Sequence, residues 1–523
     1  MPPIPTSMLF YLFKSRDFGS SESVGSIFIN KKPTEIMRKD RISFFRLPPT
    51  AFPINDCKTT GICKNLSAMN DQSDTIAAIA TAPGEAGIAI IRISGTESLT
   101  VADRIFSHAG KPPSHRPPGA FMRGFVKSNE RVLDEAILLI MRAPHSYTRE
   151  DVLEIQCHGG FVSARRILQT ILHEGVRLAE PGEFTKRAFL NGRIDLVQAE
   201  AVLDLIRAQS DRSAEAAVEQ LEGGLSYSFD DIYGKTLRVC ADLEATLDFS
   251  EDSTPAEIIP DGIAQVHMIL EQIRGILETW EEGHLLREGA LVVISGRPNV
   301  GKSTLLNALL GRNRAIVSPM PGTTRDTLEE TIILEGIPIR LVDTAGLRST
   351  TCEIEQEGVR RARSHMQKAD LHLYIIDASK PMDNEDHSHL KTLKAEKSIV
   401  IINKIDLGVR IREKDTAGFA HIQAQLNTSN GLKEIQKGII ERLGLTYSGQ
   451  PRAVISERHK NILQKSVMDI KEALKILESG QEDAIVLAVS HLRFAIEFLG
   501  QITGKTYHTE LLNSIFSRFC VGK

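Results

Sequence analysis

The sequence predicts a multidomain protein that combines α+β and α/β architecture. Its 523 residues exceed one typical domain, so two to four domains are expected. Four short strand-like runs lie within residues 75–156, and the first two flank a tight turn. Apolar runs that alternate with a loop and a helix near residues 290–310 are typical of a parallel sheet. Helical stripes lie on both sides of that second pattern, so we expect an α/β domain inserted into a helical domain.

The N-terminal α+β domain is predicted to span residues 69–187. Its strand-like runs are residues 75–81, 87–93, 135–142 and 151–156. The first two flank a turn at Pro83-Gly84. Gly159-Gly160 then opens a helix that is expected to continue through Leu172.

Residues 188–288 and 447–523 are predicted to be two halves of one helical domain. In the first half, apolar residues recur at the spacings that mark one helix face: Leu196, Ala199, Leu203 and Ile206. This pattern continues to about Leu286 and is broken at 253–255. The second half repeats it with Leu463, Val467, Ile470, Leu474 and Leu477. Such stripes are usually core, so we expect the two halves to pack as one bundle.

The most informative stretch runs from Gly296 to Ser303 and fits the phosphate-binding pattern G-x-x-x-x-G-K-[ST]. It follows an apolar run, residues 290–294, and precedes a helix-like run. Backbone N–H groups of such a loop converge on phosphate oxygens, Lys302 can reach the terminal phosphates and Ser303 can bind Mg²⁺. The inserted domain, residues 289–446, is therefore predicted to be a Ras-like P-loop domain that hydrolyses nucleotides.

Three further motifs complete the metal site and select guanine. Asp343-Thr-Ala-Gly346 follows a second strand-like run, where a carboxylate can hold Mg²⁺ through water. Thr324 offers a second Mg²⁺ ligand in the loop between these motifs. Asn403-Lys-Ile-Asp406 follows a third apolar run, and Asp406 can accept two hydrogen bonds from the N1–H and exocyclic amine of guanine. The four motifs in this order predict a GTPase.

Water activation requires a further polar group in this chain. Ras-type enzymes orient the attacking water with a Gln directly after D-x-x-G, and that position is Leu347 here. The following acidic segment contains three carboxylates that could act on the water: Glu353, Glu355 and Glu357. Charge stabilisation would come from Arg325 or Arg348, or from a monovalent cation in place of an arginine finger.

Composition favours a soluble protein in a reducing compartment. Charged residues make up 25% of the chain, the net charge is −4, and no apolar run approaches the roughly 18 residues of a membrane span. The six cysteines are scattered without a C-x-x-C pair, which disfavours a zinc site and a disulfide framework. We expect a cytoplasmic protein without a membrane partner.

Residues 1–68 differ from the rest of the chain. They carry ten Lys or Arg against five Asp or Glu and show no sustained periodicity. We expect a disordered or non-native extension with Met69 as the natural start, because Asp17 and Glu22 interrupt it and no clear amphipathic helix is present. The other interpretation is a transit peptide, which would make the protein mitochondrial.

The tail from Phe516 to Lys523 carries Cys520 on a Gly-containing stub. A Cys in this position can act as a reactive thiol or enter a pocket, whereas an ordinary tail is the simpler interpretation of the residues alone. The last four residues are not a prenylation signal, since Lys523 is a poor terminal residue.

Together these features resemble the family of tRNA-modifying GTPases called MnmE or TrmE, over about Asp74 to Lys523. Besides the nucleotide motifs and the tail, the resemblance rests on five segments: Asp74–Ile76 with Pro83-Gly84, Ile91–Gly95, Ser146–Glu154, His158–Gly160 and Pro181–Arg193. It implies that the N-terminal domain binds folate and joins two copies into a homodimer. It also implies a flavoprotein partner, MnmG, in a heterotetramer, with tRNA as the substrate.

The implied reaction adds an aminomethyl or carboxymethylaminomethyl group to carbon 5 of a tRNA wobble uridine. The one-carbon unit would come from a tetrahydrofolate derivative, 5-formyl- or 5,10-methylene-tetrahydrofolate. The implied metal ions are Mg²⁺ and K⁺.

The resemblance also assigns residues, position by position. Folate contacts fall on Arg92, Glu154, Arg193 and Lys523. The Mg²⁺ ligands are Ser303 and Thr324, and the K⁺ ligands are Asn299, Ser318, Met320 and Thr323. The GTP-binding residues are Asn299, Val300, Gly301, Lys302, Ser303, Thr304, Ser318, Pro319, Met320, Pro321, Gly322, Thr323, Thr324, Asp343, Thr344, Ala345, Gly346, Asn403, Lys404, Ile405 and Asp406. Glu355 matches the carboxylate that orients the water, and we predict that Cys520 assists the one-carbon chemistry.

The sequence departs from the family pattern at three places. The guanine loop usually contains Ser-Ala, which the stretch 425–429 lacks, so its base contact stays open while Asp406 keeps the specificity. Arg149 stands where Gly is usual, and Arg193 stands where Lys is common.

Two other functions are compatible with parts of the sequence. A ribosome-assembly GTPase that acts as a binding switch would share the nucleotide motifs but lack the N-terminal segments and the terminal Cys. A folate-dependent aminomethyltransferase with a regulatory GTPase domain would work without a flavoprotein.

Overall fold

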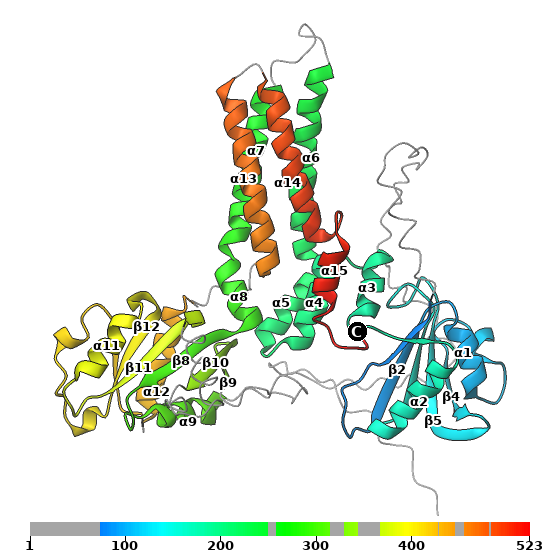
Figure 1. Cartoon of the computed structure of the whole chain (residues 1–523), viewed down its shortest axis with the longest axis horizontal. Coiled ribbons are helices and arrows are strands. Elements are labelled where there is room, and N and C mark those ends of the chain that lie inside the picture. The colour runs from blue at the N-terminus through cyan, green and yellow to red at the C-terminus, as the bar shows by residue number, and fades with distance from the viewer. Residues whose placement is uncertain are drawn as a thin grey trace, which may run out of the picture. The chain divides into compact units, whose positions relative to one another are not determined.

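The computed structural model describes residues 74–248, 258–313, 329–343, 367–426, 428–444, 454–480 and 483–523. Residues 71–523 form one compact unit. Its described part contains two separate sheets and a group of long helices (Figure 1). The predicted combination of α+β, helical and α/β architecture is confirmed.

The first sheet has seven strands in the order β3-β4-β5-β6-β2-β1-β7, all antiparallel except β1 with β7. Its strands are β1 (Ile76–Ile79), β2 (Ile88–Ser94), β3 (Phe106–Ser107), β4 (Phe121–Ser128), β5 (Arg131–Met141), β6 (Val152–His158) and β7 (Arg177–Leu178). The four predicted strands correspond to β1, β2, β5 and β6. The sequence missed β3 and β7 because they are two residues long, and β4 because its exposed face carries Phe121 and Phe125, which hides the alternation.

Two helices, α1 (Ser98–Ile105) and α2 (Phe161–His173), cover one face of this sheet. Their apolar residues share one core with alternate strand residues such as Met122 and Leu138. The other face is covered at β1 by Phe184 of the helical segment, whereas it is exposed at β4 and β5 among the described residues. There Phe121 is 77% exposed, and Phe125 and Ile137 are more than 40% exposed.

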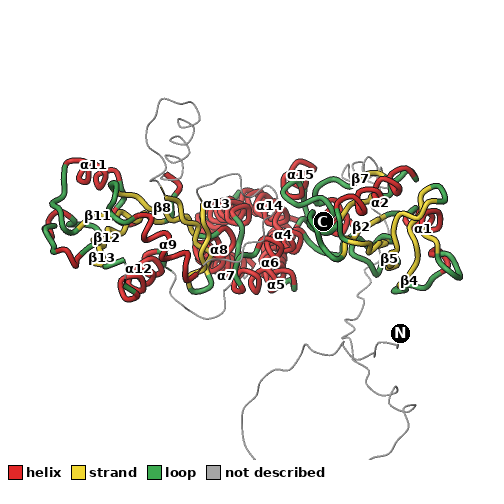
Figure 2. Tube along the Cα trace, turned by 90° about the horizontal axis from the view of Figure 1, so that it is seen from below, coloured by secondary structure: helices red, strands yellow, loops and turns green. Residues whose placement is uncertain are grey.

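The long helices form a bundle that joins residues before and after the α/β insertion. The helices before the insertion are α3 (Glu183–Leu190), α4 (Leu196–Arg207), α5 (Asp211–Leu221), α6 (Gly224–Asp248), α7 (Ile258–Glu278) and α8 (Trp280–Glu288). Those after it are α13 (Glu457–Ser479), α14 (Ala484–Thr503) and α15 (Thr509–Phe516). Leu243 of α6, Val266 of α7, Leu463 of α13 and Leu492 of α14 lie in one core, and Figure 2 views these helices end-on. The predicted packing of two distant helical segments as one bundle is confirmed.

The first helical segment is more interrupted than the sequence predicted. The predicted break at 253–255 lies outside the described residues, but α4 already ends at Arg207 and α5 starts anew. Ser210 causes this restart, since its hydroxyl accepts a hydrogen bond from the backbone N–H of Ser213 (3.2 Å). A serine N-cap inside an apolar stripe is easily overlooked, because the stripe continues in the next helix.

Helix α14 corrects the prediction that no segment is long and apolar enough for a membrane span. By length and composition its 20 residues meet that criterion, and it is the only described helix that does. Its apolar side packs in the bundle core, and Arg493 on another side pairs with Glu244 of α6 (2.7 Å). These contacts are those of a core helix.

The second sheet has six strands in the order β13-β12-β11-β8-β10-β9, all parallel except β9 with β10. Its strands are β8 (Ala290–Gly296), β9 (Glu329–Leu334), β10 (Ile337–Asp343), β11 (Leu371–Asp377), β12 (Ser398–Asn403) and β13 (Ala420–Ala424). Among the described residues its α-helices are α9 (Lys302–Asn313), α11 (Asn384–Thr392) and α12 (Ser429–Arg442). The predicted strand–loop–helix unit at 290–310 is confirmed as β8 and α9. Because β8, β10, β11 and β12 are parallel, the loops after them meet at one edge of the sheet.

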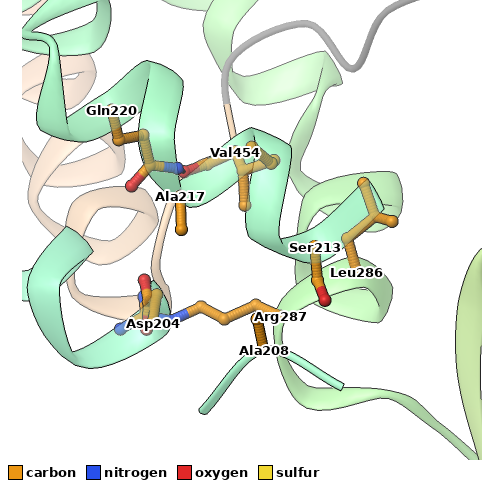
Figure 3. A pocket seen from close by; sticks show the side chains of 9 residues that line it. Asp204, Ala208, Ser213, Ala217, Gln220, Leu286, Arg287 and Val454 are labelled. Carbon is orange, nitrogen blue, oxygen red and sulfur yellow. Dashed lines mark hydrogen bonds and ion pairs between the residues drawn. The ribbon is translucent and has the colours of Figure 1, made fainter. Parts of the chain in front are cut away.

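The bundle holds both ends of this α/β insertion. Arg287, just before β8, donates from Nε to Asp204 of α4 (2.8 Å), and burial raises the pKa of Asp204 to about 6 while Arg287 opposes that rise. Gln220 of α5 donates a hydrogen bond to the carbonyl of Val454, where the chain returns. These residues line a small pocket (Figure 3), which contains none of the residues assigned to nucleotide or folate.

Candidate functional site

The loop between β8 and α9 has a backbone that glycine makes possible. Gly296 (φ 138°) and Gly301 (φ 114°) adopt conformations that residues with a Cβ rarely take. A Cβ on Gly296 would collide with the carbonyl of Ile375 in β11, and one on Gly301 would collide with the Asn403 amide. The two glycines therefore let the loop lie against the next strand and the guanine motif.

Lys302 extends over this loop. Its ammonium donates to the carbonyls of Gly296 (2.8 Å) and Arg297 (2.7 Å), and the residue is buried. Ser303 and Thr304 follow it as exposed residues in the first turn of α9. The cation and the helix N-terminus thus lie together, as a site for terminal phosphates needs.

Asn403 fastens the end of β12 to the phosphate loop. Its side-chain N–H donates to the carbonyl of Val300 (2.8 Å), and its side-chain oxygen accepts from the backbone N–H of Leu426 (3.3 Å). Leu426 belongs to the stretch in which the family pattern is not kept, so that stretch still packs against Asn403. Asp406 lies exposed in the short 3₁₀ helix Ile405–Leu407 that follows.

Lys404 links three segments of the nucleotide site. Its ammonium donates to the carbonyl of Asn299 (2.8 Å) and to Asp377 at the end of β11 (2.7 Å). Burial alone would raise the pKa of Asp377, but hydrogen bonds from Lys404 and Ser379 hold that pKa below its usual value. Asn299 itself is exposed and adopts a left-handed backbone (φ 63°).

The sequence reasoning missed Asp377 as a supporting residue. A signal was present, because it ends a strand of the same parallel sheet just as Asp343 ends β10. Asp343 pairs in register with Ile294 of β8, so its backbone lies beside the start of the phosphate loop.

Several assigned residues lie outside the described part of the chain. They are the stretch Ser318–Thr324, the stretch Thr344–Gly346 and Glu355. Their roles stay predictions. No group of three metal-binding side chains is found in the described ranges. The hydroxyl of Ser303 and the carboxylate of Asp343 are hard oxygen donors, which suit Mg²⁺, and the exposed amide of Asn299 offers an oxygen suited to K⁺.

A second cluster forms on the first sheet around Arg92 and Glu154. These residues face each other on neighbouring strands β2 and β6, and Arg92 Nη2 lies 2.8 Å from Glu154 Oε1. Both side chains are largely buried. The Arg92 guanidinium carbon lies 5.5 Å from the ring centres of both Tyr147 and Phe184.

The C-terminal tail lies against this cluster. The carbonyl of Gly522 accepts from Arg92 Nη1 (3.4 Å), and the carbonyl of Cys520 accepts from the backbone N–H of Gly182 (3.4 Å). Gly522 (φ 98°) fits so closely that a Cβ would collide with the carbonyl of Ile79 in β1. Residues about 430 positions apart in the sequence therefore meet here (Figure 2).

Apolar packing brings the tail to this position. Helix α15 and the residues after it bury Leu512, Phe516 and Phe519 in one core with Phe189 of α3 and Leu196 of α4. Each fully buried side chain of this size contributes roughly 1.5–3 kcal/mol. The tail is thus anchored by its aromatic residues, and the stub that follows extends to Arg92.

The structure brings together all four residues that the sequence assigned to folate. Burial, reinforced by the charge of Arg92, lowers the pKa of Lys523, while Glu154 opposes that shift. Arg193 donates to the carbonyl of Tyr147 (3.0 Å), and its guanidinium carbon lies 4.7 Å from the Tyr147 ring centre. The site is therefore a cationic cluster with one carboxylate and an aromatic ring, which fits a pterin with an acidic tail. The roles of these residues stay predictions.

Tyr147 and Phe184 were not singled out from the sequence. Tyr147 lies in the Ser146–Glu154 segment that carries the family resemblance, and that was the available signal. Phe184 is fully buried and gave no signal beyond that of an ordinary core residue.

Cys520 differs from the other cysteines that the structure describes. Its side chain is exposed, whereas Cys157 and Cys240 are buried. Burial, followed by the charge of Asp134, raises the pKa of Cys157 to about 11, and burial with the nearby Glu244 raises that of Cys240 to about 12. These two thiols are therefore unreactive core residues.

Comparison with known proteins decides the family. Residues 75–193 match the family described as "GTP-binding protein TrmE N-terminus". Residues 196–520 match the family described as "MnmE helical domain". This chain belongs to the MnmE family. The tRNA modification GTPase MnmE of Geobacillus kaustophilus is 43% identical over 460 residues, covering 86% of this chain and 99% of the relative. That of Moorella thermoacetica is 44% identical over 464 residues, with the same coverage of both chains.

Among solved structures, the G domain of the T. maritima FeoB iron transporter is 27% identical and covers 29% of this chain and 98% of its own. Its TM-score is 0.23, too low to support a conclusion. The match of residues 75–193 to the TrmE N-terminus argues against a ribosome-assembly GTPase, which would lack that segment.

Proposed function

We propose that this protein is a GTPase that modifies tRNA at carbon 5 of the wobble uridine, together with a flavoprotein partner of the MnmG type. The added group would be aminomethyl or carboxymethylaminomethyl, built from a tetrahydrofolate one-carbon unit. Family membership supports the coarser statement, tRNA modification by a GTPase. A cytoplasmic location stays a prediction.

One observation carries the folate part of this proposal. Lys523 and the Cys520 stub lie against the Arg92–Glu154 pair, although these residues come from opposite ends of the described chain. Placing Lys523 beside Arg92 brings two positive charges together, which does not help to hold a purely structural tail in place. An anionic ligand would stabilise these crowded cations, and Glu154 could accept hydrogen bonds from a pterin amine.

The nucleotide site can perform hydrolysis with the following division of roles. Lys302 and the α9 N-terminus would neutralise the terminal phosphates, and Asp406 would read guanine. Bound Mg²⁺ and K⁺ would supply positive charge to the phosphates. Ser303 and Asn299 are the described residues that would hold these ions, while Glu355 would orient the water. Lys404 and Asp377 keep Asn299 in place.

The exposed part of the first sheet, at β4 and β5, supports a homodimer. Phe121 and Phe125 on β4 and Ile137 on β5 are exposed on that face. Exposed apolar side chains that gather on a sheet face are typical of protein interfaces. We propose that a second copy of this chain covers them.

The decisive experiment is nucleoside analysis of tRNA from cells that lack this protein. Loss of the modified wobble uridine, restored by the parental gene but not by Glu154→Ala, would support the proposal. Reconstitution with and without the flavoprotein separates it from an aminomethyltransferase that acts alone. An unchanged nucleoside profile in the deletion strain would exclude this function.

GTP hydrolysis should be faster in KCl than in NaCl at equal ionic strength. Leu347 stands where Ras-type enzymes carry the water-orienting Gln. We therefore expect a cation held by Asn299 to stabilise the negative charge that develops on the phosphates in the transition state. Asn299→Ala should abolish the difference, while Asn307→Ala on the exposed side of α9 serves as a matched control. Equal rates in both salts for the parental protein would contradict the prediction.

A further inference from the structure

Arg149 has an unusual backbone for its residue type. Its φ of 60° lies in the left-handed region, which a Cβ makes unfavourable and which glycine adopts freely. Strain of this kind is retained where the surrounding structure or a function holds it in place. Arg149 is exposed, so core packing does not explain it.

Its guanidinium and that of Arg193 are held by a reciprocal pair of hydrogen bonds. Arg149 Nη1 donates to the carbonyl of Asn191 (2.9 Å), and Arg193 Nη1 donates to the carbonyl of Tyr147 (3.0 Å). Each arginine thus reaches from its own segment to the other one. The side-chain amide of Asn191 also donates to the carbonyl of Thr148 (2.6 Å), so these two segments are already fastened without either arginine.

The two guanidinium groups lie close to the same stretch of backbone. Arg149 Nη1 would be 3.5 Å from a Cβ placed on Gly192, the residue next to Arg193. Arg193 also lies over the ring of Tyr147. Arg193 therefore shares the Tyr147 ring with Arg92, and Arg149 lies against the two residues that precede Arg193.

Neither guanidinium has an acidic partner within the described ranges of the chain. The nearest acidic residues in sequence are already engaged: Glu150 pairs with Arg187, Asp151 pairs with Arg142, and Asp195 accepts from the backbone N–H of Gln198. Each guanidinium has five N–H donors, and the hydrogen bonds above use one each. Both residues are exposed, and the planar guanidinium group is suited to carboxylates.

We infer that Arg149 and Arg193 form a subsite for the carboxylates of a poly-γ-glutamate tail on the folate. This inference rests on the proposed folate site and adds a preference for the length of the tail. The pterin end would bind at the Arg92–Glu154 pair, and the acidic tail would run past Tyr147 toward Arg193 and Arg149. An ordered pair of guanidinium groups binds a second or third carboxylate without further loss of side-chain freedom.

Binding of 5-formyl-tetrahydrofolate with one or three glutamates to the full-length chain tests this inference. The triglutamate should bind about 3- to 10-fold more tightly, as expected for one or two partly exposed charge-assisted contacts. Arg149→Gln should remove most of that gain and leave monoglutamate binding unchanged. Arg166→Gln, an exposed arginine on α2 of the same sheet domain, removes the same charge and should change neither value.

A second variant separates binding from folding. Arg149→Gly removes the cation and relieves the unfavourable backbone, so the melting temperature should stay level or rise while the preference for the triglutamate is still lost. Equal affinity of the parental protein for both ligands would overturn the inference but leave the proposed folate site standing. No binding of either ligand would overturn both.

Transfer-RNA phosphates are the competing anion, and the same variants address them. If Arg149→Gln weakens binding of tRNA and leaves the preference for the triglutamate intact, the subsite belongs to RNA and the inference is wrong. Loss of the triglutamate preference with unchanged tRNA binding supports it.

Discussion

Cys520→Ser is expected to lower tRNA modification roughly 10²-fold or more and to leave GTP hydrolysis unchanged. A thiolate is a far better nucleophile than a hydroxyl at neutral pH, and the stub that carries Cys520 lies beside the proposed one-carbon site. Because the Cys520 side chain is exposed, the substitution should also leave the melting temperature unchanged. Hydrolysis, folate binding and wobble-uridine modification should be measured on one preparation.

Cys157→Ser provides the contrast for this experiment. Its thiol is buried and donates to the carbonyl of Ala89 (3.5 Å), so serine should lower the melting temperature and reduce all activities together. If Cys520→Ser behaves like Cys157→Ser, its role is structural. If modification persists at the parental level with folate bound normally, Cys520 has no chemical role.

Glu355→Ala is expected to lower the kcat of GTP hydrolysis by about 10²–10⁴-fold and to change GTP affinity little. A group that orients water acts mainly in the transition state, so its loss affects turnover and not ground-state binding. Single-turnover hydrolysis and nucleotide titration separate these quantities.

The neighbouring carboxylates Glu353 and Glu357 are the matched controls. All three belong to one acidic segment, so each alanine variant removes the same charge from the same stretch. A larger loss of kcat in Glu353→Ala or Glu357→Ala would show that the wrong carboxylate was chosen. A parallel loss of GTP affinity in all three would indicate a general electrostatic effect of the segment.

Local sequence patterns predicted the strands and helices whose apolar periodicity is complete. The strands β8, β10 and β12 and the helix α9 follow directly from apolar runs and a glycine loop, since nearly all side chains of the three strands are buried. β4 escaped prediction because its exposed face carries Phe121 and Phe125, so apolar residues stand on both faces of the strand. Helix α14 was underestimated because Arg493 and Glu497 interrupt its apolar residues without leaving the helix.

The sequence by itself determined the nucleotide motifs, the family resemblance and the residue types of the folate site, because each depends on short spacings within one segment. Only the tertiary structure decided that Lys523 lies near Arg92 and that the segments of Arg149 and Arg193 are joined by hydrogen bonds. These contacts join segments up to about 430 residues apart. Two features create these contacts: the burial of Phe516 and Phe519, and the cross-strand register of β2 and β6. Local periodicity predicts neither the packing partner of a helix nor the register of a sheet.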